Sequence, residues 1–152
     1  IATALIGEEV ILKNICIDHL RTVIKKIEQT GAIVDIYNSA DGESLKVTAS
    51  SIIKPVNITT SEYPGFPTDL QAQWMVLMAL AEGNSTITEN IYKDRFTHIA
   101  ELKRFGAIIS LNENAVHPSS FVLSNFPNLT WHNIASSNVM FAPSAIPWIS
   151  FI

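Results

Sequence analysis

The pattern of apolar and polar residues near the start of the chain changes period twice. Residues 9–14 predict a strand that ends in a turn. Apolar residues then recur with the spacing of one helix face, and these residues are Leu20, Val23, Ile24 and Ile27. We expect Asp18 to cap this helix and Gly31 to end it.

An alternating pattern follows the helix. Residues 32–37 predict a strand, residues 38–42 form a turn cluster with an Asp-Gly pair, and residues 44–49 predict the returning strand of a hairpin. The order of this first unit is therefore β-α-β-β. The chain opens at Ile1 in what we interpret as a further strand, without an initiator methionine, so we expect a fragment of a longer protein.

A second copy of the pattern appears later in the chain. Residues 11–18 can be laid over residues 87–94 and residues 28–36 over residues 103–111, which are offsets of 76 and 75. Such a period is too long for a solenoid, so we expect two copies of one supersecondary unit inside a larger domain. A predicted strand at residues 56–60 and a helix around Trp74 precede the second copy, which gives the order β-α-β-α-β.

The stretch Tyr63-Pro64-Gly65-Phe66-Pro67-Thr68-Asp69-Leu70-Gln71-Ala72-Gln73 joins the two units. Its two prolines and its glycine neither continue a helix nor fit a central strand, so the backbone turns there. Apolar residues at helical spacing follow, namely Leu70, Trp74, Leu77, Met78 and Ala81, and Gly83 ends the helix. Asp69 is thus a carboxylate at the positive end of a helix, which is typical of a helix cap.

The composition is that of a globular domain with a core. The 152 residues are 47% hydrophobic and 16% charged, with a formal net charge of −4. No Lys/Arg stripe is present to neutralise phosphates, so we expect no nucleic-acid partner. No apolar run of the sequence is long enough to predict a membrane-spanning helix.

The cysteine and histidine content limits which disulfides and metal sites the chain can form. A single cysteine, Cys16, excludes an internal disulfide framework and a cysteine-rich zinc site, and we expect it to be a small buried residue. His19, His117 and His132 lie at no metal-ligand spacing with a partner. We therefore expect neither a metal nor a cofactor.

The end of the chain differs in character from the rest. From Asn114 to Ile152 there is no Asp, Glu, Lys or Arg, and four prolines break any long element. We interpret this tail as foreign to the fold, as a frameshift, a retained intron or a junction would produce. The alternative is a genuine extension that packs as irregular structure. The expected division is residues 1–55, residues 56–116 and the tail 117–152.

The stretch from Tyr63 to Gln73 resembles a signature of the UDP-N-acetylglucosamine 1-carboxyvinyltransferases, the enolpyruvyl transferases that begin peptidoglycan precursor synthesis. The resemblance is carried further by Ala81-Glu82-Gly83, Ile87-Thr88-Glu89-Asn90-Ile91-Tyr92, Arg95-Phe96, His98, Glu101-Leu102, Arg104 and Gly106-Ala107. It runs from about Ile1 to Val116 and stops before the tail. It implies an α/β (α+β) fold, the inside-out α/β barrel of this family, of which the chain holds two repeated units and is incomplete.

The resemblance also implies roles for residues. The family transfers enolpyruvyl from phosphoenolpyruvate to the 3′-hydroxyl of UDP-N-acetylglucosamine, and Asp69 falls on its general base, a role that a positioned carboxylate can fill. Ile91 falls on a backbone contact to the sugar nucleotide, or is a core residue at a strand end. Arg95 holds an anion near the cleft, or is a surface ion pair with Asp94. We interpret Thr68 as the helix cap, with assistance near the substrate as the alternative.

Groups that this reaction needs are missing from the sequence. By resemblance, the lysine, the arginines and the cysteine-bearing loop of the phosphoenolpyruvate site belong to other segments, and Cys16 does not match that cysteine. We therefore expect the isolated chain to be inactive and to self-associate through exposed apolar surface, including faces of the helix around Trp74. The alternatives are a non-catalytic remnant or a relative of 5-enolpyruvylshikimate-3-phosphate synthase. The expected location is the bacterial cytoplasm, with a plastid as the alternative.

Overall fold

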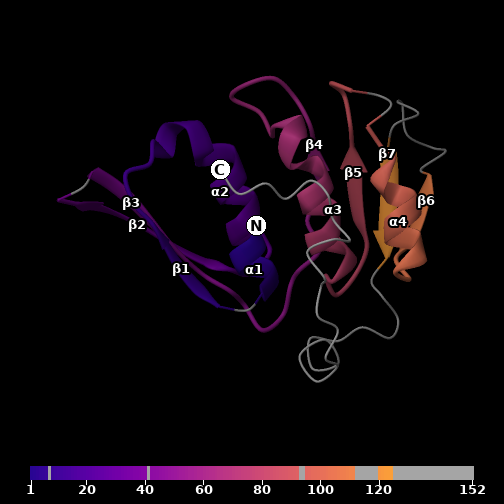
Figure 1. Ribbon diagram of the computed structural model, residues 1–152, viewed down its shortest axis with the longest axis horizontal. Coiled ribbons are helices and arrows are strands. Elements are labelled where there is room, and N and C mark those ends of the chain that lie inside the picture. Colours follow the sequence, from indigo (N-terminus) through magenta and orange to yellow (C-terminus); the bar gives the residue numbers. More distant parts are fainter. Residues whose placement is uncertain (7, 41, 93–94, 112–119, 125–152) are drawn as a thin grey trace.

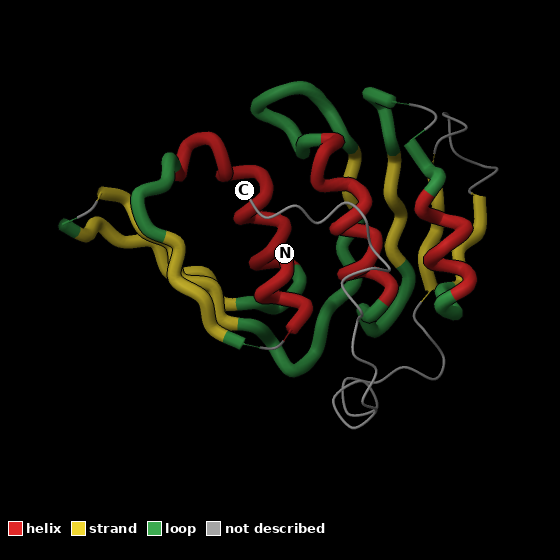
Figure 2. Tube along the Cα trace, in the orientation of Figure 1, coloured by secondary structure: helices red, strands yellow, loops and turns green. Residues whose placement is uncertain are grey.

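The computed structural model describes residues 1–6, 8–40, 42–92, 95–111 and 120–124, and these residues form two open sheets with helices between them (Figure 1). The strands are β1 (Glu9–Leu12), β2 (Ile33–Ser39), β3 (Gly42–Thr48), β4 (Ile58–Thr59), β5 (Ser85–Thr88), β6 (Ile108–Leu111) and β7 (Ser120–Ser124). The helices are α1 (Ala2–Ile6), α2 (Ile17–Gln29), the 3-10 turn η1 (Thr68–Leu70), α3 (Gln71–Ala79) and α4 (His98–Arg104). Figure 2 shows α1, α2 and α3 in the layer between the sheets.

The first sheet has the strand order β1-β3-β2, and both neighbours of β3 run antiparallel to it. Leu45 lies opposite Leu12 and Ile36 in this register. Leu45 and Val47 are buried with the apolar face of α2, because period-2 alternation turns one face of β3 toward the helix. The β2–β3 hairpin and the β-α-β-β order of the first unit are confirmed.

The second unit repeats this topology. Along the chain it runs β5, α4, β6, β7, and in the sheet its strand order is β5-β7-β6, with β7 antiparallel to both neighbours. The first unit runs β1, α2, β2, β3 with the strand order β1-β3-β2, so the repeat found in the sequence is a structural repeat. The short strand β4 pairs in parallel with β5, and α3 connects the two.

Strand β7 corrects the interpretation of the tail. We expected no regular structure after residue 116, yet Ser120–Ser124 is hydrogen-bonded between β5 and β6. This strand completes the second unit, because it takes the position that β3 holds in the first. Residues 125–152 lie outside the part of the chain that the structure describes.

Three local expectations were wrong. The opening segment is the helix α1 rather than a strand, in keeping with the helix propensity of alanine and leucine. Asp18 lies inside α2 and accepts a hydrogen bond from Arg21 Nε at 2.7 Å, whereas the N-cap position is Cys16. Cys16 is exposed rather than buried. The first amide of α2, that of Ile17, donates to Glu43 Oε2 at 3.0 Å, so the hairpin supplies the cap.

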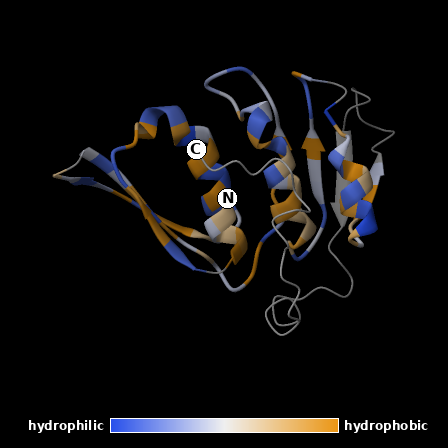
Figure 3. Ribbon diagram, viewed as in Figure 1, coloured by the Kyte–Doolittle hydropathy of each residue, from blue (hydrophilic) through white to orange (hydrophobic). Residues whose placement is uncertain are grey.

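Helix α3 is buried on most of its sides. Trp74, Leu77 and Met78 are fully buried, and the Phe66 ring meets the Trp74 ring edge-on at 5.3 Å. The apolar surface that α3 exposes is limited to Val76, which is 37% exposed, so this helix contributes less exposed apolar surface than we expected. The exposed apolar side chains of the first sheet belong to its edge strands β1 and β2, with Ile33 61% and Ile36 51% exposed (Figure 3). Self-association through this surface remains a prediction.

An apolar hollow of about 240 Å³, partly open to solvent, lies between the first sheet and the helices α1 and α2. Apolar side chains from α2 and β3 line it, together with Leu70 and Gln73.

No helix in the described ranges has both the length and the apolar character needed to cross a membrane.

Candidate functional site

The loop between β4 and α3 is a closed turn that fixes the position of Asp69. The Ser61 amide donates to the carbonyl of Phe66 at 3.0 Å, and the Gly65 amide donates to that of Glu62 at 2.7 Å. Phe66 is 2% exposed and anchors the loop in the core. A Cβ at position 65 would collide with the Ser61 side chain, so the turn requires glycine. The chain then enters η1 at Thr68.

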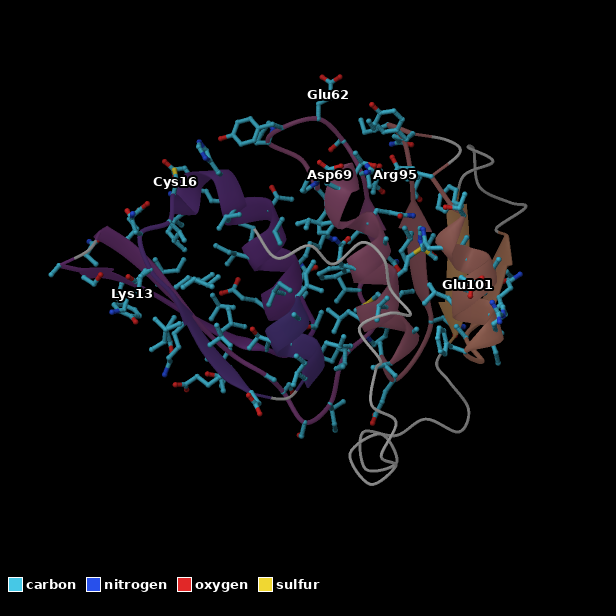
Figure 4. All side chains as sticks on the ribbon, viewed as in Figure 1. Lys13, Cys16, Glu62, Asp69, Arg95 and Glu101 are labelled. Carbon is cyan, nitrogen blue, oxygen red and sulfur yellow. The ribbon has the colours of Figure 1, made fainter. Side chains whose placement is uncertain are left out.

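Asp69 and Arg95 form an ion pair on the surface (Figure 4). Arg95 Nη1 donates to Asp69 Oδ1 at 2.8 Å and lies 3.3 Å from Thr68 Oγ1, and its guanidinium carbon is 5.6 Å from the centre of the Tyr92 ring. The Asp69 side chain is 81% exposed, so its carboxylate is open to a ligand. The structure thus brings together three of the residues singled out from the sequence, which are Thr68, Asp69 and Arg95. Asp94, the alternative partner of Arg95, lies outside the described residues.

Neither Thr68 nor Asp69 acts as a helix cap. The N-cap positions of η1 and α3 are Pro67 and Leu70, and neither helix has a side-chain cap hydrogen bond. The Thr68 hydroxyl instead donates to Glu89 Oε2 at 2.9 Å. The interpretation of Thr68 as a cap was wrong, because its hydroxyl group binds the buried carboxylate of Glu89, which follows β5, and not a backbone amide of its own helix.

Glu89 is a site residue that the sequence analysis did not single out. It follows β5 and is 0% exposed. Burial alone would raise the pKa of this carboxyl, but hydrogen bonds from Thr60, Tyr92, Ile91 and Thr68 outweigh burial and lower the pKa. The sequence holds one indication of this burial: position 89 lies two residues after Ile87 and so continues the same face of the strand pattern, and the structure buries Ser85, Ile87 and Glu89.

Ile91 lies in the loop that follows β5. Its side chain is 37% exposed, so its interpretation as a core residue was wrong. The Ile91 amide donates to Glu89 Oε1 at 2.8 Å, and the Tyr92 amide donates to the same oxygen at 3.0 Å. The backbone of this loop is therefore held by the buried carboxylate that also binds Thr68.

His98 is the first residue of α4. Its Nε2 lies 3.1 Å from Met75 Sδ, and its side chain is half-buried. Burial lowers the pKa of His98, and the positive charge of Arg95 lowers it further. Since the unfolded chain takes up a proton here more readily than the folded chain, this group makes folding less favourable as the pH falls below about 6.5.

Replacing Arg95 with Met tests this electrostatic contact. We expect the pKa of His98 to rise in R95M, because one of the two causes that lower it is removed, and to stay below its ordinary value, because burial remains. A proton NMR titration of the His98 ring measures the change. The matched control is R104M, which removes an exposed cation of the same helix that pairs with Glu101. An identical His98 titration in R95M and the unmodified chain would contradict the contact.

The described residues do not contain a group of three or more His, Cys, Asp or Glu side chains that could hold a metal ion. His19 meets the Tyr63 ring edge-on at 6.0 Å, and His98 contacts Met75. His117 and His132 lie outside the described residues. What the site offers is a carboxylate, a guanidinium and an ordered loop backbone.

The sequence matches the family model described as EPSP synthase (3-phosphoshikimate 1-carboxyvinyltransferase) over residues 1–142. The chain belongs to this family. The match runs past Val116, where we expected the resemblance to end, and it includes the strand β7. Family membership thus extends into the charge-free tail as far as residue 142.

Two curated relatives illustrate the similarity to other members of the family. The UDP-N-acetylglucosamine 1-carboxyvinyltransferase of Orientia tsutsugamushi (strain Ikeda) is 46% identical over 109 residues, which are 72% of this chain and 25% of that protein. The enzyme of the same name from Desulfosudis oleivorans is 36% identical over 146 residues, which are 96% of this chain and 33% of that protein. The chain therefore spans between a quarter and a third of the length of these relatives.

A solved structure shows the same fold. The enolpyruvyl transferase NikO from Streptomyces tendae matches with a TM-score of 0.61 and 21% sequence identity, over 82% of this chain and 29% of that chain. The fold is accordingly the mixed α/β fold of the enolpyruvyl transferases. The described residues contain two of its β-α-β-β units, in open sheets.

Proposed function

We propose that this chain forms the part of a UDP-N-acetylglucosamine 1-carboxyvinyltransferase that binds the sugar nucleotide and supplies the general base, Asp69. The observation that carries the proposal is the Asp69 carboxylate, which is 81% exposed at the start of η1 and held by Arg95 at 2.8 Å. The names of relatives that are 36% and 46% identical favour UDP-N-acetylglucosamine as the acceptor. Those relatives come from bacteria, and we propose a cytoplasmic location.

The chemistry assigned to Asp69 is a proton transfer. As the 3′-hydroxyl oxygen of the sugar attacks C2 of phosphoenolpyruvate, its proton passes to the carboxylate, while another group protonates C3. Loss of a proton from C3 then expels phosphate and leaves the enolpyruvyl ether. Arg95 Nη1 donates to Oδ1 of Asp69, and we propose that the other carboxylate oxygen accepts the proton. We propose that Ile91 contacts the sugar nucleotide from the loop after β5.

The groups that bind and protonate phosphoenolpyruvate are, in this proposal, provided by segments other than this chain. We therefore expect the isolated 152-residue chain to release no phosphate above background when both substrates are present. A coupled phosphate assay measures this, and turnover by the isolated chain would contradict the expectation.

A chimera tests whether this chain supports catalysis when the rest of a transferase is present. In it, the 146 aligned residues of the Desulfosudis oleivorans transferase are replaced by those of this chain. This exchange includes β7, so no junction divides the sheet formed with β5 and β6. We expect turnover of UDP-N-acetylglucosamine by the chimera. A folded chimera without activity would count against the proposal.

The family description names a second acceptor, 3-phosphoshikimate. The two acceptors differ in size and charge, and they can be compared by amide NMR shifts of the 152-residue chain. We expect UDP-N-acetylglucosamine to shift the amides of Ile91 and Tyr92. Shifts of these amides by shikimate 3-phosphate alone would favour the second acceptor.

A further inference from the structure

Glu89 is a buried carboxylate that the proton transfer does not use. One of its oxygens, Oε1, accepts hydrogen bonds from Thr60 Oγ1 at 2.7 Å, the Ile91 amide at 2.8 Å and the Tyr92 amide at 3.0 Å. Thr60 Oγ1 in turn accepts from the Asn90 amide at 2.9 Å. The carboxylate thus joins the end of β4 to the loop after β5.

The second oxygen of Glu89 leads to the proposed base. Oε2 accepts from Thr68 Oγ1 at 2.9 Å, and the same hydroxyl oxygen lies 3.3 Å from Arg95 Nη1. Arg95 Nη1 also donates to Asp69 Oδ1 at 2.8 Å. A continuous set of polar contacts therefore runs from Glu89 through Thr68 and Arg95 to Asp69.

We propose that Glu89 is a positioning residue, which holds the Asp69–Arg95 pair and the Ile91 backbone in one fixed arrangement. The inference rests on the proposed function of Asp69 and deepens it. A carboxylate suits this task because it only accepts hydrogen bonds, and its charge strengthens each of them. A glutamine of the same shape would turn its amide NH2 group toward Thr68, so that this hydroxyl oxygen would have to accept from both the amide and Arg95.

Hydrogen exchange in the 152-residue chain tests the backbone half of the proposal without any activity. In E89Q the acceptor is neutral, so we expect protection of the Ile91 and Tyr92 amides to fall about tenfold. The matched control is E82Q, which changes an exposed glutamate in the turn after α3 and should leave both amides protected. Unchanged protection of both amides in E89Q would overturn the backbone role.

The chimera tests the link to Asp69 through a double-mutant cycle. We expect E89Q to lower kcat about tenfold, and T68V, which removes the hydroxyl at nearly constant volume, to do the same. If Glu89 acts through Thr68, E89Q has little further effect on kcat in the T68V background. Additive losses would show that Glu89 affects kcat independently of Thr68 and would overturn the proposed route, and full activity of E89Q would overturn the positioning role.

One further variant separates this inference from the proposed function. If D69N in the chimera keeps full activity, Asp69 is not the base and the proposed function fails. If D69N is inactive while E89Q is fully active, the proposed function stands and only the positioning role fails. Thermal unfolding of each variant identifies losses of kcat that follow from a loss of folding.

Discussion

We expect the replacement of Asp69 with Asn to lower kcat of the chimera by about 100- to 10,000-fold, the range that a general base contributes. Asparagine keeps the shape of the side chain and its oxygen, but it cannot accept the proton of the 3′-hydroxyl. Because the Asp69 side chain is 81% exposed, the change leaves no cavity and no buried unpaired charge. The expected loss is therefore one of chemistry and not of folding.

Steady-state kinetics with both substrates measures this effect. The loss should appear in kcat, with a smaller change in the KM for UDP-N-acetylglucosamine, because the proton moves only in the transition state. The control is E101Q, which alters an exposed carboxylate of α4 that pairs with Arg104 at 2.8 Å. If D69N retains kcat within about threefold of the unmodified chimera, general-base catalysis by Asp69 is excluded.

We expect the replacement of Trp74 with Ala to destabilise the 152-residue chain by about 3–5 kcal/mol, the range measured for large aromatic side chains in cores. Trp74 is fully buried at the centre of α3. It meets the Phe66 ring edge-on at 5.3 Å, and its Nε1–H group donates to the carbonyl of Val56 at 3.3 Å. The substitution opens a cavity and leaves that carbonyl without this donor.

Urea unfolding followed by circular dichroism measures the free energy of unfolding of this variant. The control on the same helix is V76A, because Val76 is 37% exposed, and we expect it to cost about 1 kcal/mol or less. If W74A costs no more than V76A, α3 does not form the core that its burial indicates.

The sequence determined the elements whose signals are local. The signals for α2 and for the β2–β3 hairpin depend on residues close together along the chain. These signals are the 3.6-residue period of α2, the glycine at position 31 after it, and the Asp-Gly pair in the turn cluster of the sequence. The internal repeat was visible for the same reason, since each copy carries its own pattern. The Pro- and Gly-rich stretch before α3 likewise predicted the turn that presents Asp69.

Predictions from the sequence were wrong where the hydrogen-bonding partner of a segment lies far along the chain. Residues 120–124 show no long alternating pattern, and they form β7 because β5 and β6 supply hydrogen-bonding edges on both sides. The prediction that Asp18 caps α2 was wrong for the same reason, because the Ile17 amide donates to Glu43 of the distant hairpin. Propensity is a weak guide whenever tertiary contacts satisfy the backbone better than local ones.

For the candidate site, the sequence by itself determined that a turn places a carboxylate at position 69, next to the start of a helix. Only the tertiary structure decided that Arg95 pairs with this carboxylate and that Thr68 binds Glu89. Those contacts join residues 26 and 21 positions apart, and no local pattern specifies them. The physical reason is that a buried carboxylate must find hydrogen-bond donors, and the fold brings those donors to Glu89 from three separate segments.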